Sequence, residues 1–345
     1  MDLSLSEDQL TVQAAFAEFF AKEATVERVR AAEPLGFDQE LWARLAGTGA
    51  VAMGLPEAAG GGGADSLDLV LVAEQYGRRI APVPLPESVA AGRLLARAGA
   101  TDLLAGVAEG RTLPTIALSP AAGGRLRLVP AGAVAEVVVG LDDGRLIALR
   151  RPPGTRPHVP PSPNFGSGPL ADWRLDDGEQ IELASGPQAA ELYRDAVADW
   201  ELLTAAALGG LRSAALDLGV SYVKARQAFG VTIGSFQAVQ HRLADLVVAG
   251  DGAQLLVYEA AWARDAGLPA ATALASMAFL FSADCAFRTA RECLQFHGGY
   301  GVALEYDIQL FFRRAKAWPL AMGDPRREYQ RLAGLIYPDP GQEED

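Results

Sequence analysis

The pattern of hydrophobic and polar positions changes twice along the chain and divides it into three parts, which are predicted to be helical, β and helical. In the first part, apolar residues recur every three to four positions, which is the spacing of one face of an α-helix. Ser6 followed by Gln9 fits a capping box at the start of the first helix. Further helices are predicted around Glu40–Ala46 and after a cap at Asp65. We therefore predict an N-terminal helical domain over residues 1–110.

Residues 111–186 change to short apolar runs separated by Pro, Gly and Asp-Asp-Gly, which is typical of β-strands and hairpins. Residues 151–170 contain seven prolines and predict an ordered but irregular connection. We therefore predict a small, reduced β-domain here. Its expected strands are 115–118, 126–129, 134–139 and 146–149.

Residues 187–337 are again helical in pattern, rich in alanine and leucine, and long enough for a bundle of at least three long helices. Breaks are predicted at Phe229-Gly230, Ala249–Gly252 and His297–Gly299. Residues 338–345 form an acidic tail that is expected to fray. The predicted fold class is therefore α+β, mostly α, with segregated helices and strands.

Composition narrows the class of protein. The 345 residues allow two or three domains, and a half share of apolar residues is enough for a large core. A net charge of −13 counts against nucleic acid and anionic membrane surfaces as partners. Two cysteines and three scattered histidines predict neither a disulfide framework nor a metal site. Without a membrane-length apolar run or a signal peptide, a soluble cytoplasmic protein is expected.

Two segments carry candidate chemistry. The first, ARQAFGVTIGSFQAVQHRLAD, begins at Ala225 and places Arg226 at a predicted helix end beside an aromatic residue and amides. A guanidinium can bind a pyrophosphate while an aromatic ring packs on a heterocycle. The second, QFHGGYG, begins at Gln295, and its paired glycines allow a ligand to approach the backbone closely. Each segment taken alone also fits ordinary structure: a surface arginine with a core phenylalanine, or a helix cap and turn.

In this order the two segments resemble the acyl-CoA dehydrogenase family, as does the turn LPEAAGG from Leu55 to Gly61. The resemblance covers about four fifths of the chain and is weakest in the middle. It implies an N-terminal helical domain, a central β-domain and a C-terminal four-helix bundle. It also implies that FAD oxidises the Cα–Cβ bond of an acyl-CoA thioester, with a glutamate removing the α-proton and flavin N5 taking the hydride.

In this family the FAD lies across a subunit interface. The resemblance implies that six residues of this chain contact the adenosine and pyrophosphate half of a FAD whose ring lies on the neighbouring subunit. They are Arg226, Phe229, Gln237, Gln295, Gly298 and Gly299.

The sequence departs from the family where the flavin ring and the base should be. The central stretch from Ala117 to Gly124 lacks the hydroxyl and backbone donors expected near the ring. Met322 stands where the family has its glutamate, and methionine cannot accept a proton. Some relatives place the base at the start of the first C-terminal helix, where Trp200 aligns and Glu201 follows. Asp324, two residues beyond Met322, is a further candidate for the base.

These departures predict a subunit that supplies one half of a shared site. The chain resembles the smaller subunit of heteromeric acyl-CoA dehydrogenases of steroid side-chain breakdown, with two copies of each chain. The resemblance implies a longer partner subunit carrying the glutamate, an acyl-CoA substrate and an electron-transferring flavoprotein as acceptor. Two alternatives stay open: a self-sufficient homo-oligomer that uses Glu201, and a structural or regulatory subunit without flavin.

Overall fold

The N-terminal part of the computed structural model, which describes residues 4–33, 35–152 and 161–337, is helical as predicted. The capping box is confirmed, since the Ser6 hydroxyl accepts from the Gln9 amide at 3.2 Å and the Gln9 side chain accepts from the Ser6 amide at 2.9 Å. Asp65 caps its helix by accepting from the Asp68 amide at 2.9 Å. The helices are α1 (Glu7–Glu23), α2 (Val26–Ala31), α3 (Gln39–Gly47), α4 (Ser66–Arg78), α5 (Leu85–Arg97) and α6 (Thr101–Ala108), with a 3-10 turn η1 (Glu57–Ala59).

The middle of the chain forms two small sheets. One has the strand order β1-β3-β4-β6, with β1 parallel to β3 and the other pairs antiparallel, and the second pairs β2 with β5. The four predicted runs correspond to β1–β4, but β1 ends at Ile116 and β3 begins only at Val137. The strands are β1 (Pro114–Ile116), β2 (Arg125–Val129), β3 (Val137–Asp142), β4 (Arg145–Arg150), β5 (Ala171–Arg174) and β6 (Glu179–Ser185).

Strands β5 and β6 were not predicted. Strand β6 lies at the edge of its sheet, and none of its residues is fully buried, so it lacks a continuous apolar run. A strand that shows one face to solvent needs only alternation, which is a weak signal in seven residues.

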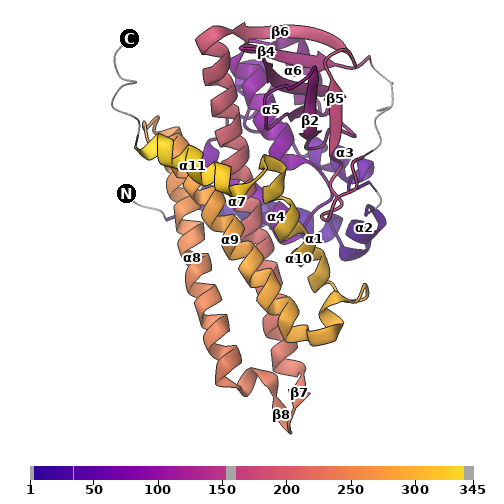
Figure 1. Ribbon diagram of the computed structural model, residues 1–345, viewed down its shortest axis with the longest axis vertical. Coiled ribbons are helices and arrows are strands. Elements are labelled where there is room, and N and C mark those ends of the chain that lie inside the picture. The colour runs from indigo at the N-terminus through magenta and orange to yellow at the C-terminus, as the bar shows by residue number, and fades with distance from the viewer. Residues whose placement is uncertain (1–3, 34, 153–160, 338–345) are drawn as a thin grey trace.

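The C-terminal part is a bundle built on α7 (Gly186–Ala225), which spans 40 residues from the β-sheet end of the molecule to the hairpin at the opposite end (Figure 1). The 3-10 turns are η2 (Ile233–Ser235), η3 (Gly298–Val302) and η4 (Pro319–Met322). The other elements are β7 (Gln227–Ala228), β8 (Val231–Thr232), α8 (Gln237–Asp265), α9 (Ala271–His297), α10 (Ile308–Ala317) and α11 (Pro325–Ile336).

The predicted break at Ala249–Gly252 is wrong, because α8 continues through it without interruption. Gly250 is buried, and a Cβ at this position would lie 1.9 Å from Nη1 of Arg212 on α7. The glycine is therefore explained by packing against a neighbouring helix. Tertiary contacts of a long helix outweigh the roughly 1 kcal/mol that one glycine costs.

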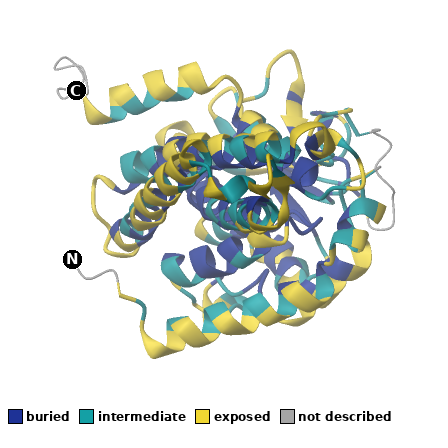
Figure 2. Ribbon diagram, turned by 90° about the horizontal axis from the view of Figure 1, so that it is seen from below, coloured by how far each residue is buried: buried dark blue, intermediate teal, exposed yellow. Residues whose placement is uncertain are grey.

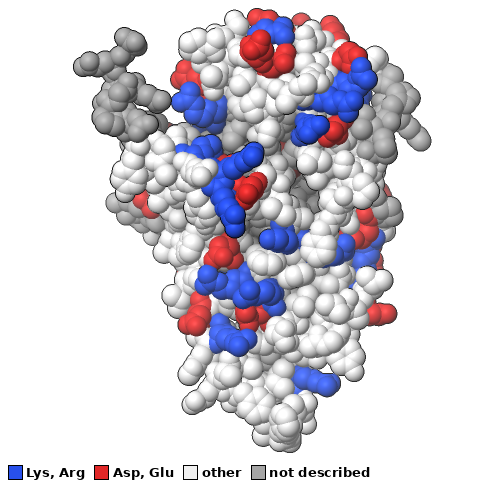
Figure 3. All heavy atoms as spheres, viewed as in Figure 1, with Lys and Arg blue, Asp and Glu red and all other residues white. Residues whose placement is uncertain are grey.

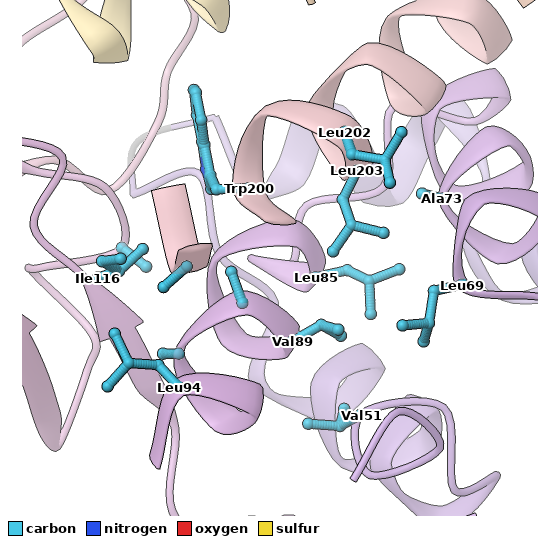
Figure 4. Close-up of a cluster of buried hydrophobic side chains, with 14 of the residues drawn as sticks. Val51, Leu69, Ala73, Leu85, Val89, Leu94, Ile116, Trp200, Leu202 and Leu203 are labelled. Carbon is cyan, nitrogen blue, oxygen red and sulfur yellow. The ribbon is translucent and has the colours of Figure 1, made fainter. Parts of the chain in front are cut away.

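The hydrophobic core joins the N-terminal helices, the sheet and the bundle. Side chains of α4, α5, β1, α7 and the turn after α3 meet in one cluster, among them Val51, Leu85, Ile116 and Trp200 (Figure 4). Viewed from below, buried residues gather in the middle, while α11, which contains no buried residue, lies at the periphery (Figure 2). This shared core fixes the orientation of α7. The first candidate segment begins at the C-terminal end of α7, at Ala225.

Helices α4 and α7 approach with their backbones in contact. A Cβ on Gly77 would lie 1.8 Å from the Ala207 carbonyl oxygen, and one on Gly210 would lie 1.9 Å from the Glu74 carbonyl oxygen. Glycine is required at both positions because backbone atoms cannot move aside as a flexible side chain can. The close approach brings the polar residues of α4 against α7.

Candidate functional site

The first candidate segment forms an exposed hairpin at the end of α7. Helix α7 ends at Ala225, and Arg226 follows as its cap, which confirms the predicted helix end. Phe229 and Gly230 form the turn between β7 and β8, both with positive φ (54° and 81°). Two consecutive left-handed residues make a tight hairpin turn that favours Asn or Gly, so a phenylalanine here is strained.

Phe229 is 96% exposed at the tip of this hairpin. Among the residues that the structure describes, its one ring neighbour is Phe236, with the centroids 6.4 Å apart. A strained, almost fully exposed aromatic residue contributes nothing to the core of its own chain. Strain and exposure at one residue therefore indicate a contact with another molecule.

The structure brings the second candidate segment beside the first. His297 at the end of α9 stacks on Tyr222 of α7 with centroids 4.0 Å apart. The Arg226 guanidinium lies 5.8 Å from the Tyr300 ring centroid, within the range of a cation–π contact. Residues separated by some seventy positions in the sequence thus share one surface.

The paired glycines leave the backbone of this surface open. Gly298 adopts φ 60° and ψ −140°, a conformation that residues with a side chain avoid. A Cβ at Gly298 or Gly299 would meet no atom within 4 Å, and both residues are exposed. Packing inside the chain therefore does not explain them, whereas a ligand lying against the backbone would.

The two glutamines complete the predicted set. Gln237 is the first residue of α8, and Gln295 lies in the last turn of α9, and both are exposed. Phe236 precedes α8 without a side-chain cap, so amide donors at this helix start are free to bind a ligand. All six predicted residues are exposed on the helix termini, hairpin and 3-10 turn of the bundle.

The charge of this end suits an anion. Lys224 and Arg226 are exposed here, whereas Arg242 is paired with Glu292 at 2.8 Å. The hairpin end shows a blue patch and no red atoms at its tip (Figure 3). A guanidinium, an aromatic ring, an open glycine backbone and an uncapped helix start together fit the adenosine diphosphate part of a dinucleotide.

A second feature is a small cavity of about 90 Å³ between α4, α5, α7, α10 and the loop at residues 164–170. Its lining includes prolines, the Arg314 guanidinium and the aromatic side chains of Tyr76, Trp200 and Trp318. Tyr76 and Trp318 stack with centroids 5.6 Å apart. The cavity is lined by a single carboxyl group, that of Glu87. Sequence analysis missed Glu87, for which the one signal is an acidic residue inside the apolar run from Ala81 to Val89.

Glu87 is a candidate proton-binding group of this cavity. The Trp200 indole donates a hydrogen bond to its carboxyl at 3.3 Å. Burial raises the pKa of Glu87, and the hydrogen bonds from its own amide and from Trp200 offset only part of that effect. Within the lining, the Thr204 hydroxyl is buried without a hydrogen-bond partner.

The other candidate bases are placed differently. Glu201 does not line this cavity, although its neighbour Trp200 does. Its carboxylate is fully buried, accepts from the Ser276 hydroxyl at 2.8 Å and is paired with Arg331. Met322 is buried in η4, and Asp324 caps α11 by accepting from the Arg326 amide at 3.0 Å. The expected base position therefore holds no acid, and Glu201 sits in a structural ion pair.

Glu201→Gln is expected to change the pH dependence of stability. Burial raises the pKa of Glu201 to about 7, although Arg331 and Ser276 partly oppose this. Since the folded pKa lies above the unfolded value, the stabilising contribution is full below about pH 4.5 and is lost as pH rises through about 7. The free energy of unfolding of the variant, taken relative to that of the wild type, should therefore rise by on the order of 3 kcal/mol between about pH 4.5 and about pH 7.

Urea unfolding at several pH values would measure this change. Glu191→Gln, an exposed carboxylate on the same helix, is the matched control and should leave the pH profile unchanged. A profile for Glu201→Gln parallel to that of the wild type would contradict the burial argument.

Comparison with known proteins places these features in context. The family pattern "Acyl-CoA dehydrogenase, N-terminal domain" matches residues 6–104, and "Acyl-CoA dehydrogenase, C-terminal domain" matches residues 201–332. Acyl-CoA dehydrogenase IpdE2 of Mycolicibacterium smegmatis is 32% identical over 340 residues, which cover 96% of this chain and 100% of that protein. IpdE2 of Mycobacterium tuberculosis is 30% identical, covering 97% and 99%.

Two similar solved structures contain paired proteins. The ChsE4-ChsE5 complex from Mycobacterium tuberculosis includes a chain with a TM-score of 0.86 and 26% identity, covering 99% of this chain and 100% of that one. The Tcur3481-Tcur3483 steroid ACAD gives a TM-score of 0.82 and 27% identity, with coverage of 96% and 98%. In the part of the chain that the structure describes, no helix is long and apolar enough to cross a membrane, and no cluster of metal-ligating side chains occurs.

Proposed function

Because the chain belongs to the acyl-CoA dehydrogenase family, we propose that it is the subunit of a two-chain enzyme that completes the FAD site of a longer partner. Members of this family are oxidoreductases that act on CH–CH bonds with FAD as cofactor. The partner would supply the catalytic glutamate and the flavin-ring site. This chain would supply the contacts to the adenosine and pyrophosphate half.

The observation that carries the proposal is a mismatch between two parts of the molecule. The surface formed by Arg226, Phe229 and Gly298 presents an exposed guanidinium, an exposed aromatic ring and an open backbone, which are groups that suit the adenosine and pyrophosphate half of a dinucleotide. The position expected for the base is held by Met322, and Glu201 is engaged with Arg331. Cofactor contacts without a catalytic base are what we expect of a subunit whose partner supplies the base.

The mechanism follows from what these side chains can do. The Arg226 guanidinium would neutralise diphosphate oxygens, and an exposed Phe229 ring would cover apolar surface of the partner or the nucleotide. The open backbone at Gly298 and Gly299 would let the nucleotide approach closely. When bound, FAD supplies the two-electron acceptor for oxidation of the acyl Cα–Cβ bond.

The two-chain relatives support both the assembly and the substrate class. One is described as a complex of two proteins and the other as a steroid ACAD. We propose a CoA ester of a steroid as substrate, an electron-transferring flavoprotein as electron acceptor and the cytoplasm as location. Nothing in the chain's own cavity selects a steroid, so this assignment rests on the relatives alone.

Co-expression with a longer acyl-CoA dehydrogenase-like chain tests the proposal. We expect the pair to co-purify as a yellow hetero-oligomer with flavin absorbance and acyl-CoA dehydrogenase activity, while this chain alone is colourless and inactive. Glu87→Gln in this chain, a control for its own cavity, should leave the activity of the pair unchanged. Activity from this chain alone would instead establish the homo-oligomer, and absence of flavin from every complex would establish a structural subunit.

A further inference from the structure

A polar cavity of about 260 Å³ lies between α1, α4, α7 and α8. A single water molecule occupies roughly 10–15 Å³ of such volume, so the cavity can hold a ligand of several atoms. Glu74, Arg212 and Gly250 line it, and Gln13 and Gln254 add amide groups. None of these residues belongs to the proposed flavin surface, so the cavity is separate from the flavin site and independent of it.

Arg212 is a buried cation without a carboxylate partner. The residue is 8% exposed, and within the described chain no carboxylate lies within 4 Å of its guanidinium, although Asp251, Glu74 and Asp217 act on it electrostatically from farther away. Its Nη2 donates to the Ser213 hydroxyl at 3.2 Å, its Nη1 reaches the Leu246 carbonyl only at 3.5 Å, and its Nε is buried without a partner. A buried guanidinium stays charged, and leaving it unpaired is costly.

Gly250 holds space for this guanidinium. A Cβ at position 250 would lie 1.9 Å from Nη1 and 2.1 Å from the central carbon of Arg212. Glycine in the middle of a long helix is unfavourable, so its presence here is explained by the room it leaves. Two residues on different helices thus keep an unpaired cation at the cavity wall.

Glu74 faces the same cavity and can act as a donor. It accepts hydrogen bonds from Gln254 at 3.3 Å and from the Tyr258 hydroxyl at 3.2 Å. Burial raises the pKa of Glu74 to about 7, against the lowering effects of these bonds and of Arg212. The titratable groups that face it are Arg212 from α7, Tyr258 from α8 and Arg78 from its own helix, while α1 contributes the neutral Gln13.

We propose that this cavity is a binding site for a small carboxylate anion, held by the Arg212 guanidinium and by the Glu74 carboxyl. The planar guanidinium matches the two oxygens of a carboxylate. The amides of Gln13 and Gln254 are hydrogen-bonded to Glu74, and they hold its carboxyl in place at the cavity wall. A carboxylate is favoured over phosphate because its two oxygens lie in one plane with the guanidinium fork, whereas a tetrahedral phosphate presents further oxygens that an ionised Glu74 would repel.

Titration calorimetry with succinate tests the proposal on the purified protein, in the assembly in which it is isolated. We expect saturable binding near pH 7, absent for sodium chloride at the same ionic strength, and weaker binding of phosphate. Arg212→Gln should weaken succinate binding about tenfold or more. Arg288→Gln, on the exposed face of α9 and paired with Asp284, should leave it unchanged.

A second variant keeps the test decisive if Arg212→Gln does not fold. Glu74→Gln retains the shape of the neutral acid and cannot ionise, so at about pH 8 it should bind succinate more tightly than the wild type. Absence of saturable succinate binding to the wild type would overturn the proposal. Binding that neither variant alters, or tighter binding of phosphate than of succinate, would overturn it as well.

Discussion

Arg226→Gln is expected to release FAD from the assembled two-chain enzyme while both chains remain associated. The Arg226 guanidinium is exposed at the end of α7, and the Tyr300 ring orients it at 5.8 Å. Charge-assisted hydrogen bonds from arginine to a diphosphate have no equivalent in glutamine. Loss of one such contact should raise the dissociation constant of FAD about ten- to a hundredfold.

Flavin fluorescence during dialysis would measure this loss, and size-exclusion chromatography would report the assembly. Arg242→Gln is the matched control, since Arg242 lies near the start of α8 at the same end of the bundle but forms an ion pair with Glu292 at 2.8 Å. The control should retain flavin. Equal flavin retention in both variants would exclude Arg226 from the cofactor site, and dissociation of the subunits would assign it to the interface.

Asp199→Asn is expected to be the most destabilising conservative substitution. Asp199 is 1% exposed on α7 and pairs with Arg97 at 2.6 Å and with Arg264 at 2.5 Å. Arg93 lies 3.4 Å away, so α5 and α8 are both tied to α7 through one carboxylate. Removing its charge takes away the one carboxylate that pairs with all three clustered guanidiniums, which should cost about 3–5 kcal/mol.

The same cluster predicts how stability responds to acid. Burial alone would raise the pKa of Asp199, but Arg93, Arg264 and Arg97 together hold it below the usual value. The stabilisation is therefore present above the unfolded pKa of about 3.9 and is lost as pH falls through the lower folded value.

Urea or thermal unfolding of Asp199→Asn would show the loss. The control is Asp217→Asn, on the same helix as Asp199. It breaks an exposed ion pair with Arg78 of α4 and should cost less than about 1 kcal/mol. Similar losses in the two variants would mean that the buried cluster contributes no more than a surface ion pair.

Local sequence signals were sufficient wherever a structure depends on neighbouring residues. The capping box at Ser6 and Gln9 and the helix end at Arg226 follow from spacing alone. Gly250 shows where such signals fail, since a glycine that suggests a break instead accommodates Arg212 from another helix. The same limit applies to Glu87, whose proximity to Trp200 depends on how α5 packs against α7.

The sequence by itself determined the family, the succession of a helical, a β and a second helical region, and the methionine at the expected base position. These depend on residue identity and short-range spacing, which the chain carries directly. Only the tertiary structure decided that the two segments share one exposed surface, that Glu201 is held by Arg331, and that the Arg212 Nε is buried without a hydrogen-bond partner. Such relations arise when helices distant in sequence pack together and exclude water, and burial then fixes which charges are paired.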